Sequence, residues 1–177
     1  MQDFKILNRR VGPKHKPLII VELGINHNGK ISIAKQIIDK AKMAGAEIIK
    51  HQTHLAEFEM SEEAKKIIPV HTKDNIFKII SDCSLSEGDE IKLKQYIQKK
   101  KMIFISTPFS REASNRLNKM KVPAFKIGSG ECNNYPLIEH ICKFNKPIIL
   151  STGMNDIPQI KKAVKIIEKN KISYALM

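Results

Sequence analysis

The chain has 177 residues, 42% of them hydrophobic and 28% charged, and its formal net charge is +13. These values are typical of a soluble globular domain with a sizeable core, and no apolar run approaches the roughly 18 residues that a membrane span needs. The lysines are spread along amphipathic segments without an aromatic-rich RNA-binding strand. We therefore expect a small anionic substrate, and no nucleic acid or membrane, as the partner of this charge.

The residue types that most often ligate metals show no ligating pattern. Three cysteines are scattered along the chain: Cys83, Cys132 and Cys142. They favour reduced thiols over a disulfide framework, so we expect a cytoplasmic protein. Four histidines have spacings that match no compact zinc motif: His27, His51, His54 and His71. We interpret each of them as an orienting or loop residue, and we expect no metal ligand among them.

Short apolar runs alternate with amphipathic segments along most of the chain. We predict six buried strands, at residues 17–22, 46–52, 102–106, 124–127, 147–150 and 173–177. Helices are predicted between them, at residues 33–41, 86–99, 113–120, 136–143 and 156–167. Ser86 and Asp156 are the predicted N-cap residues of two of these helices, because their side-chain oxygens can accept a hydrogen bond from the first turn.

Two regions stand outside this alternation. Residues 1–16 are basic and polar with a weak apolar alternation, which predicts a short arm or hairpin. Residues 53–86 form a long connection, in which we predict two helical pieces at 61–67 and 74–82. Connections of this length are usually functional segments or lids.

The alternation of strands and helices predicts an α/β protein with a parallel sheet and right-handed crossovers. Two architectures fit this pattern: an open doubly wound sheet, or part of a (β/α)₈ barrel. The periodicity does not choose between them. In both, the C-terminal ends of the strands lie on one face, where the chemistry is expected.

Polar side chains stand at the ends of the first five predicted strands: Glu22, Lys50, Gln52, Thr107, Lys126, Ser129, Ser151 and Thr152. Two lysines within apolar strands, with hydroxyl groups nearby, indicate a site for a phosphate or a carboxylate. Gly128 and Gly130 flank Ser129 in a turn whose N–H groups can contact an anion. Glu22 and Glu131 are candidate acids or bases, or else ion-pair partners of the lysines.

Five segments together resemble bacterial N-acetylneuraminate (sialic acid) synthases, nearly end to end and with matching spacing. They are Val21–Gly29, Lys50–His54, Ser106–Arg111, Lys126–Ile138 and Leu150–Asn155. The residues of Lys50–His54 and Gly130–Pro136 are more similar to the N-acetylneuraminate branch than to the legionaminic or pseudaminic acid branches.

The resemblance implies a (β/α)₈ TIM-type barrel, truncated here after its sixth strand. Residues 1–16 would be the N-terminal arm and residues 17–177 a partial synthase barrel, with the antifreeze-like C-terminal domain of the family absent. The implied reaction condenses phosphoenolpyruvate with N-acetylmannosamine and water, giving N-acetylneuraminate and phosphate. It also implies a homodimer and a divalent metal, Mn²⁺ or Mg²⁺, whose ligands are expected beyond residue 177.

The resemblance also implies roles for particular residues. The phosphoenolpyruvate-binding residues would be Lys50, Thr107, Lys126, Ser129 and Ser151. The sugar-binding residues would be Gln52, His71, Phe109 and Glu131. The catalytic residues would be Glu22, close to the reacting carbon and water, and Glu131. His71 stands where the family has a sugar-contacting asparagine, which leaves the exact acceptor open.

Two alternatives remain beside this interpretation. The chain could be a non-catalytic truncated product, or it could belong to a synthase of a related legionaminic-type or pseudaminic-type acid. Because the metal ligands and the closing strands are expected further along the chain, we expect this length alone to be inactive.

Overall fold

The computed structural model describes residues 3–177 and is built on a parallel sheet of six strands. The strands are β3 (Ile20–Gly24), β4 (Ile48–Thr53), β5 (Ile103–Pro108), β6 (Phe125–Ile127), β7 (Ile148–Leu150) and β8 (Tyr174–Leu176). They pair in the order of the sequence, which confirms the predicted parallel α/β sheet. This order lacks the reversal of a doubly wound sheet. Within residues 3–177, the outer strands β3 and β8 do not pair with each other.

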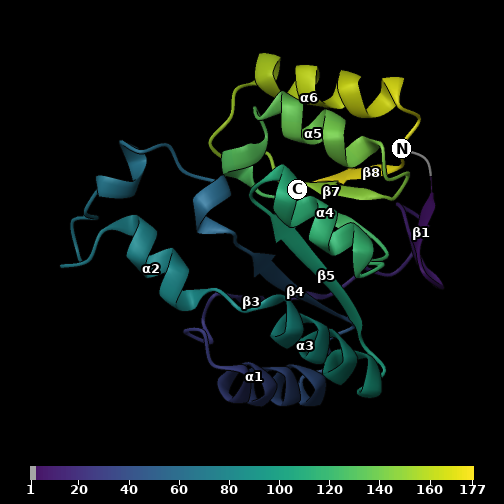
Figure 1. Ribbon diagram of the computed structural model, residues 1–177. Helices are drawn as coiled ribbons and strands as arrows, with labels where there is room; N and C mark the ends of the chain where they lie inside the picture. Colours follow the sequence, from purple (N-terminus) through teal and green to yellow (C-terminus); the bar gives the residue numbers. More distant parts are fainter. Residues whose placement is uncertain (1–2) are drawn as a thin grey trace.

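Five helices follow the strands and succeed one another around the sheet (Figure 1). They are α1 (Ile31–Met43), α3 (Glu87–Lys99), α4 (Arg111–Lys119), α5 (Tyr135–Cys142) and α6 (Ile157–Lys169). The predicted caps are confirmed: the Ser86 side chain accepts a hydrogen bond from the Asp89 amide, and Asp156 forms a capping box with Gln159. Such caps satisfy amide groups that have no partner inside the helix.

The long connection between β4 and α3 contains one of the two predicted helical pieces but not the other. It contains two short 3₁₀ turns, η1 (Ala56–Phe58) and η2 (Ala64–Lys66), and then helix α2 (Ile76–Cys83). The helix predicted at 61–67 is therefore wrong, and only the three residues of η2 coil there. Pro69 disfavours the helical conformation at the residue before it, and Ile67 and Ile68 are both exposed, so no apolar face is available to stabilise a helix.

The two faces of the sheet carry different side chains, because successive residues of a strand point in opposite directions. One face packs against the helices through Ile49, Phe104, Phe125, Ile127, Ile148 and Leu150, and we call it the outer face. The other, inner face has an apolar layer made by Ile20, Ile48, Ile105, Ala124 and Ile149. Two residues further along the same strands come Glu22, Lys50, Thr107, Lys126 and Ser151, which makes the inner face polar towards the C-terminal ends of the strands.

An N-terminal hairpin packs against the apolar layer of the inner face. Its strands β1 (Phe4–Ile6) and β2 (Arg9–Val11) pair antiparallel, and Phe4 and Ile6 are buried with the apolar residues of the strands. Arg9 fastens the hairpin to the start of β4 by donating to both carboxylate oxygens of Glu47, at 2.6 and 3.2 Å. No helix among residues 3–177 is long and apolar enough to cross a bilayer.

We predict that Ile6→Ala lowers the free energy of unfolding by about 2–4 kcal/mol, because the side chain is fully buried and its loss leaves a cavity. Urea denaturation measures this difference. The matched control is Leu7→Ala, in which the neighbouring side chain, 60% exposed, is truncated with little expected change. An equal loss in both variants would show that the hairpin does not contribute to the core.

Candidate functional site

The polar part of the inner face is an ion cluster on neighbouring strands. Lys50, from β4, is buried and its Nζ lies 2.5 Å from a carboxylate oxygen of Glu22 on β3. The same ammonium group donates a hydrogen bond of 3.3 Å to the hydroxyl of Thr107 on β5. Glu22 keeps about half of its side-chain surface exposed, at 51%, so the carboxylate remains accessible from outside.

Lys126 is the second buried amine of this face. Its Nζ donates to the Ser151 hydroxyl at 2.6 Å and to the backbone carbonyl of Ile127 at 2.8 Å. Burial, and then the positive charge of Lys50, lower the pKa of Lys126 to about 8, while the carboxylate of Glu22 acts in the opposite direction. The ammonium group is therefore charged at neutral pH, although its surroundings disfavour that charge.

The cluster has the composition of an anion site. Two buried amines lie close enough to repel each other, and Glu22 supplies one negative charge against them. The Thr107 and Ser151 hydroxyls add donors that can reach the same ligand. A phosphate or carboxylate placed between the lysines would compensate the excess positive charge and would accept charge-assisted hydrogen bonds.

Two further hydroxyls named from the sequence point elsewhere. The Ser129 hydroxyl lies 3.8 Å from the sulfur of Met154, and its backbone carbonyl accepts a hydrogen bond from Asn155. The Thr152 hydroxyl donates to the carbonyl of Met177. The turn that contains Ser129 is a 3₁₀ turn, η3 (Ser129–Glu131), and neither Gly128 nor Gly130 adopts a positive φ there. Its tightness therefore comes from the 3₁₀ hydrogen bonds rather than from a left-handed glycine.

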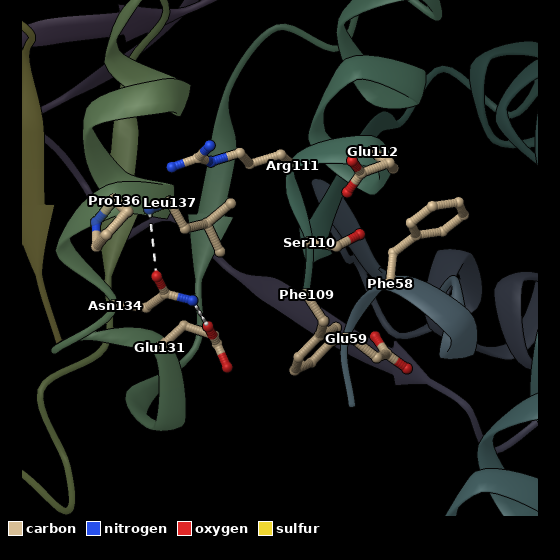
Figure 2. A pocket seen from close by; sticks show the side chains of 10 residues that line it. All are labelled: Phe58, Glu59, Phe109, Ser110, Arg111, Glu112, Glu131, Asn134, Pro136 and Leu137. Carbon is tan, nitrogen blue, oxygen red and sulfur yellow. Dashed lines mark hydrogen bonds between the residues drawn. The ribbon is translucent and has the colours of Figure 1, made fainter. Parts of the chain in front are cut away.

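A cavity of about 340 Å³ lies among the segments that follow strands β4, β5 and β6. It is lined by Phe58, Glu59, Phe109, Ser110, Arg111, Glu112, Glu131, Asn134, Pro136 and Leu137. Figure 2 shows Glu131 and Asn134 on one side of this cavity and Phe58 and Glu59 on the other. Asn134 donates to the Glu131 carboxylate at 2.6 Å while its own oxygen caps α5 through the Leu137 amide. The cavity is thus lined by polar and charged side chains and two aromatic rings, and Asn134 holds the Glu131 carboxylate in place.

A smaller cavity of about 230 Å³ shares three of these residues and continues under α2. Its walls are His54, Glu59, Met60, Ile76, Ile80, Phe109 and Glu131. The His54 ring stacks on Phe109 with a centroid distance of 4.1 Å, and its Nδ1 lies 3.0 Å from both carboxylate oxygens of Glu59. The other ring nitrogen lies 3.5 Å from the side-chain oxygen of Gln52. Phe109 and Glu131 therefore line both cavities, and Gln52 contacts the His54 side chain that lines the smaller one.

His71 does not join this arrangement. It is exposed on the connection between η2 and α2, and it lines neither of the two cavities. The structure therefore leaves the sugar-binding role of His71 as a prediction. Asn134, His54 and Glu59, in contrast, shape the site although sequence reasoning did not assign them a role in it.

A buried network on the outer face was not anticipated as a unit. The Nε2 atoms of His27 and His51 are 3.1 Å apart, and His51 Nδ1 lies 3.2 Å from the carboxylate of Glu90. Burial, and then the neighbouring His51, lower the pKa of His27 to about 4, so its ring is neutral at ordinary pH. Glu90 also accepts hydrogen bonds from Thr53 at 2.7 Å and from Arg116 at 3.2 Å.

The side chains of residues 3–177 do not fit a catalytic metal ion. No group of three or more His, Cys, Asp or Glu side chains within this part of the chain is arranged to hold one. His27, His51 and Glu90 are engaged with each other, and His54 is engaged with Glu59.

Comparisons with known proteins show which proteins the chain is similar to in sequence and fold. The chain is 42% identical over 96% of its length to the uncharacterized protein MJ1065 of Methanocaldococcus jannaschii, and 37% identical over 88% to N,N′-diacetyllegionaminic acid synthase of Campylobacter jejuni. It spans 48% of each of these proteins, about half the length of the curated relatives it matches.

A solved structure is similar to the chain as well. The N-acetylneuraminic acid (sialic acid) synthetase of Leptospira borgpetersenii, in complex with citrate, superposes with a TM-score of 0.86 and 29% identity, over 99% of this chain and 58% of that one. One relative is a legionaminic acid synthase and the other comparison a sialic acid synthetase, so the similarity does not single out one acceptor. The profile of the NeuB family matches residues 37–177, and the chain therefore belongs to the NeuB family.

Proposed function

We propose that this chain is the phosphoenolpyruvate-binding and sugar-binding part of a synthase that makes N-acetylneuraminate from phosphoenolpyruvate, N-acetylmannosamine and water. The observation that carries the proposal is the pair of buried lysines, Lys50 and Lys126, near the C-terminal ends of parallel strands, together with a polar cavity lined by the segments that follow β4, β5 and β6. The five β/α units and the sixth strand would be part of a (β/α)₈ barrel, and the sequential order of the strands supports this.

Phosphoenolpyruvate would bind on the inner face of the sheet. Its phosphate and carboxylate together need more positive charge than one lysine supplies, and Lys50 and Lys126 meet that need. Thr107 and Ser151, already hydrogen-bonded to the two ammonium groups, would turn their hydroxyls to the anion. Ser129 would join through its backbone amide or after rotation of its side chain, whose hydroxyl now faces Met154.

The acceptor sugar would occupy the cavity lined by Phe109 and Glu131, with Gln52 at its edge. The Glu131 carboxylate, oriented by Asn134, is suited to accept hydrogen bonds from sugar hydroxyls and to exchange a proton with them. The ring of Phe109, backed by His54, offers an apolar face to the sugar. A related acceptor of the legionaminic type remains the second candidate, because the Campylobacter relative is a synthase of that acid.

In the proposed reaction, C3 of phosphoenolpyruvate attacks the aldehyde carbon of the open-chain sugar. Water adds at C2, and the phosphate leaves by cleavage of the C2–O bond. Glu22, half exposed and paired with Lys50, is placed to accept the proton of that water. Lys126 and Ser151 would stabilise the charge that gathers on the departing phosphate. Activation of the aldehyde by a metal would require ligands beyond residue 177.

We predict that Lys126→Ala weakens phosphoenolpyruvate binding by about 1.5–3 kcal/mol, because a charge-assisted hydrogen bond is lost. Calorimetry on the purified chain measures the dissociation constant directly. Lys169→Ala is the matched control: it removes an exposed lysine at the last turn of α6 and should leave binding unchanged. Equal affinities of the Lys126 variant and the unaltered chain would argue against this role of Lys126.

A second prediction concerns pH. An anion binds to the charged form of Lys126, whose pKa is lowered to about 8, so affinity should fall as the pH rises through that value. The charge of phosphoenolpyruvate does not change near pH 8, because phosphate monoesters lose their second proton near pH 6. Lys126→Arg should remove this dependence, since a guanidinium stays charged. If affinity is constant from neutral to strongly alkaline pH in the unaltered chain, Lys126 does not bind the anion.

A further inference from the structure

Three ionisable side chains are buried behind the proposed site, on the outer face of the sheet. His27, in the loop between β3 and α1, is 0% exposed, and His51 of β4 and Glu90 of α3 are each 1% exposed. His51 faces the helices, with its ring 6.2 Å from that of Phe104, whereas its neighbours Lys50 and Gln52 face the inner side. The three residues therefore touch no proposed substrate, and the reaction as proposed does not use them.

The hydrogen bond from the Gly29 amide indicates where the protons of the network lie. The amide of Gly29 donates to His27 Nδ1 at 3.2 Å, so that nitrogen carries a lone pair and the proton of the neutral ring is on Nε2. His27 Nε2–H then donates to His51 Nε2 at 3.1 Å. The remaining proton of His51 is consequently on Nδ1, which lies 3.2 Å from the Glu90 carboxylate but forms no hydrogen bond with it or with any other described group. The hydrogen bonds thus run from the Gly29 amide through His27 to His51, and His51 meets Glu90 of α3 through a close charge contact.

These hydrogen bonds begin where the backbone ladder of β3 becomes irregular. The pairing of β3 with β4 shifts between Glu22 and Gly24, so the strand leaves its regular register right after the Glu22 carboxylate. Beyond that shift, the contact between His27 and His51 ties the loop back to β4 through side chains. It therefore restores, a few residues later, the connection that the backbone pairing loses.

The same loop is held from its other side by the end of α2. A Cβ atom at Gly29 would come within 2.4 Å of the backbone oxygen of Asp82, so the loop lies directly against that helix. Helix α2 carries Ile76 and Ile80, which line the smaller cavity. A displacement of this loop would therefore shift both Glu22 and the part of α2 that lines the smaller cavity.

We propose that His27 is a positioning residue: through His51 and Glu90 it fixes the end of β3, and with it the Glu22 carboxylate, against Lys50. The inference rests on the proposed function in that Glu22 and Lys50 are placed there in the phosphoenolpyruvate site. Arg116 and Thr53 complete the anchor, because both donate to Glu90 and so join α4 and β4 to the network.

The test compares His27→Ala with the unaltered chain by calorimetry with phosphoenolpyruvate, far below the melting temperature of either protein. We expect affinity to fall roughly 10- to 100-fold, the range in which loss of a supporting contact weakens a preorganised site. His27→Gln, whose amide can still donate to His51, should recover most of the affinity. If His27→Ala does not fold, His27→Leu fills the same space without the hydrogen bonds and replaces it.

The control separates positioning from general stability. Tyr96→Phe removes the hydrogen bond that the Tyr96 hydroxyl donates to the Asp39 carboxylate, whose oxygens lie 2.8 and 2.9 Å away, and which joins α3 to α1 away from the site. It should lower the melting temperature and leave the affinity unchanged. A lower melting temperature with unchanged affinity in the His27 variants as well would overturn the proposal, because it would show a structural role alone.

Two spectroscopic measurements need no substrate. Long-range ¹H–¹⁵N spectra should show His27 protonated on Nε2 and His51 on Nδ1, and the opposite tautomers would overturn the proposal. The ammonium signal of Lys50, protected by Glu22, should broaden or shift in His27→Ala. If the unaltered chain binds no phosphoenolpyruvate, the proposed function fails, and the Lys50 signal alone then decides whether His27 positions the pair.

Discussion

Two lysine side chains are buried on one face of a parallel sheet, and the rest of the structure is consistent with keeping them charged there. An ammonium group loses its hydration on burial, and a second one nearby adds repulsion, so both must have oxygen partners. Lys50 has Glu22 and Thr107, and Lys126 has Ser151 and a backbone carbonyl. These partners leave the cluster with an excess positive charge, which an anionic substrate would neutralise.

The strand period explains how one short sheet can hold both a core and a charged site. Ile48 and Lys50 share the inner face of β4, as Ala124 and Lys126 do on β6, and in each pair the polar residue is the later one. The hairpin closes over the apolar end through Phe4 and Ile6. The same alternation directs His51 to the outer face, where its network with Glu90 can support the strand without occupying the site.

Much of this arrangement could be predicted from the sequence, because it depends on local patterns. Apolar runs interrupted by a lysine predicted the strands and the charged face, and Ser86 and Asp156 marked the helix starts. The helix predicted at 61–67 does not form, although the residues of this segment allow a helix. Its absence could not be predicted from local sequence, because it depends on the lack of a neighbouring surface against which a helix could pack. In the sequence, Glu90 and Arg116 look like residues of the solvent-exposed faces of their helices. Only the packing of α3 and α4 shows that Glu90 is buried and that Arg116 is partly buried.

The sequence determines the direction of the two lysine side chains better than that of Ser129 and His71, for a physical reason. The lysines lie within strands, so the period of the strand fixes their direction. Ser129 and His71 lie in turns and connections, where direction depends on contacts that are remote in sequence. The resemblance that suggested their roles agrees with the family to which the chain belongs. It does not determine where their side chains point.

The central claim is that Lys50 and Lys126 form the site of an anionic substrate, and the protonation of Lys126 tests it most directly. Its pKa can be measured in the chain by NMR titration of the lysine side-chain signals, with and without phosphoenolpyruvate. The account predicts a pKa of about 8 in the free chain and a clear rise when phosphoenolpyruvate is bound, because the anion favours the charged form. A pKa that does not change in the presence of saturating phosphoenolpyruvate would contradict it.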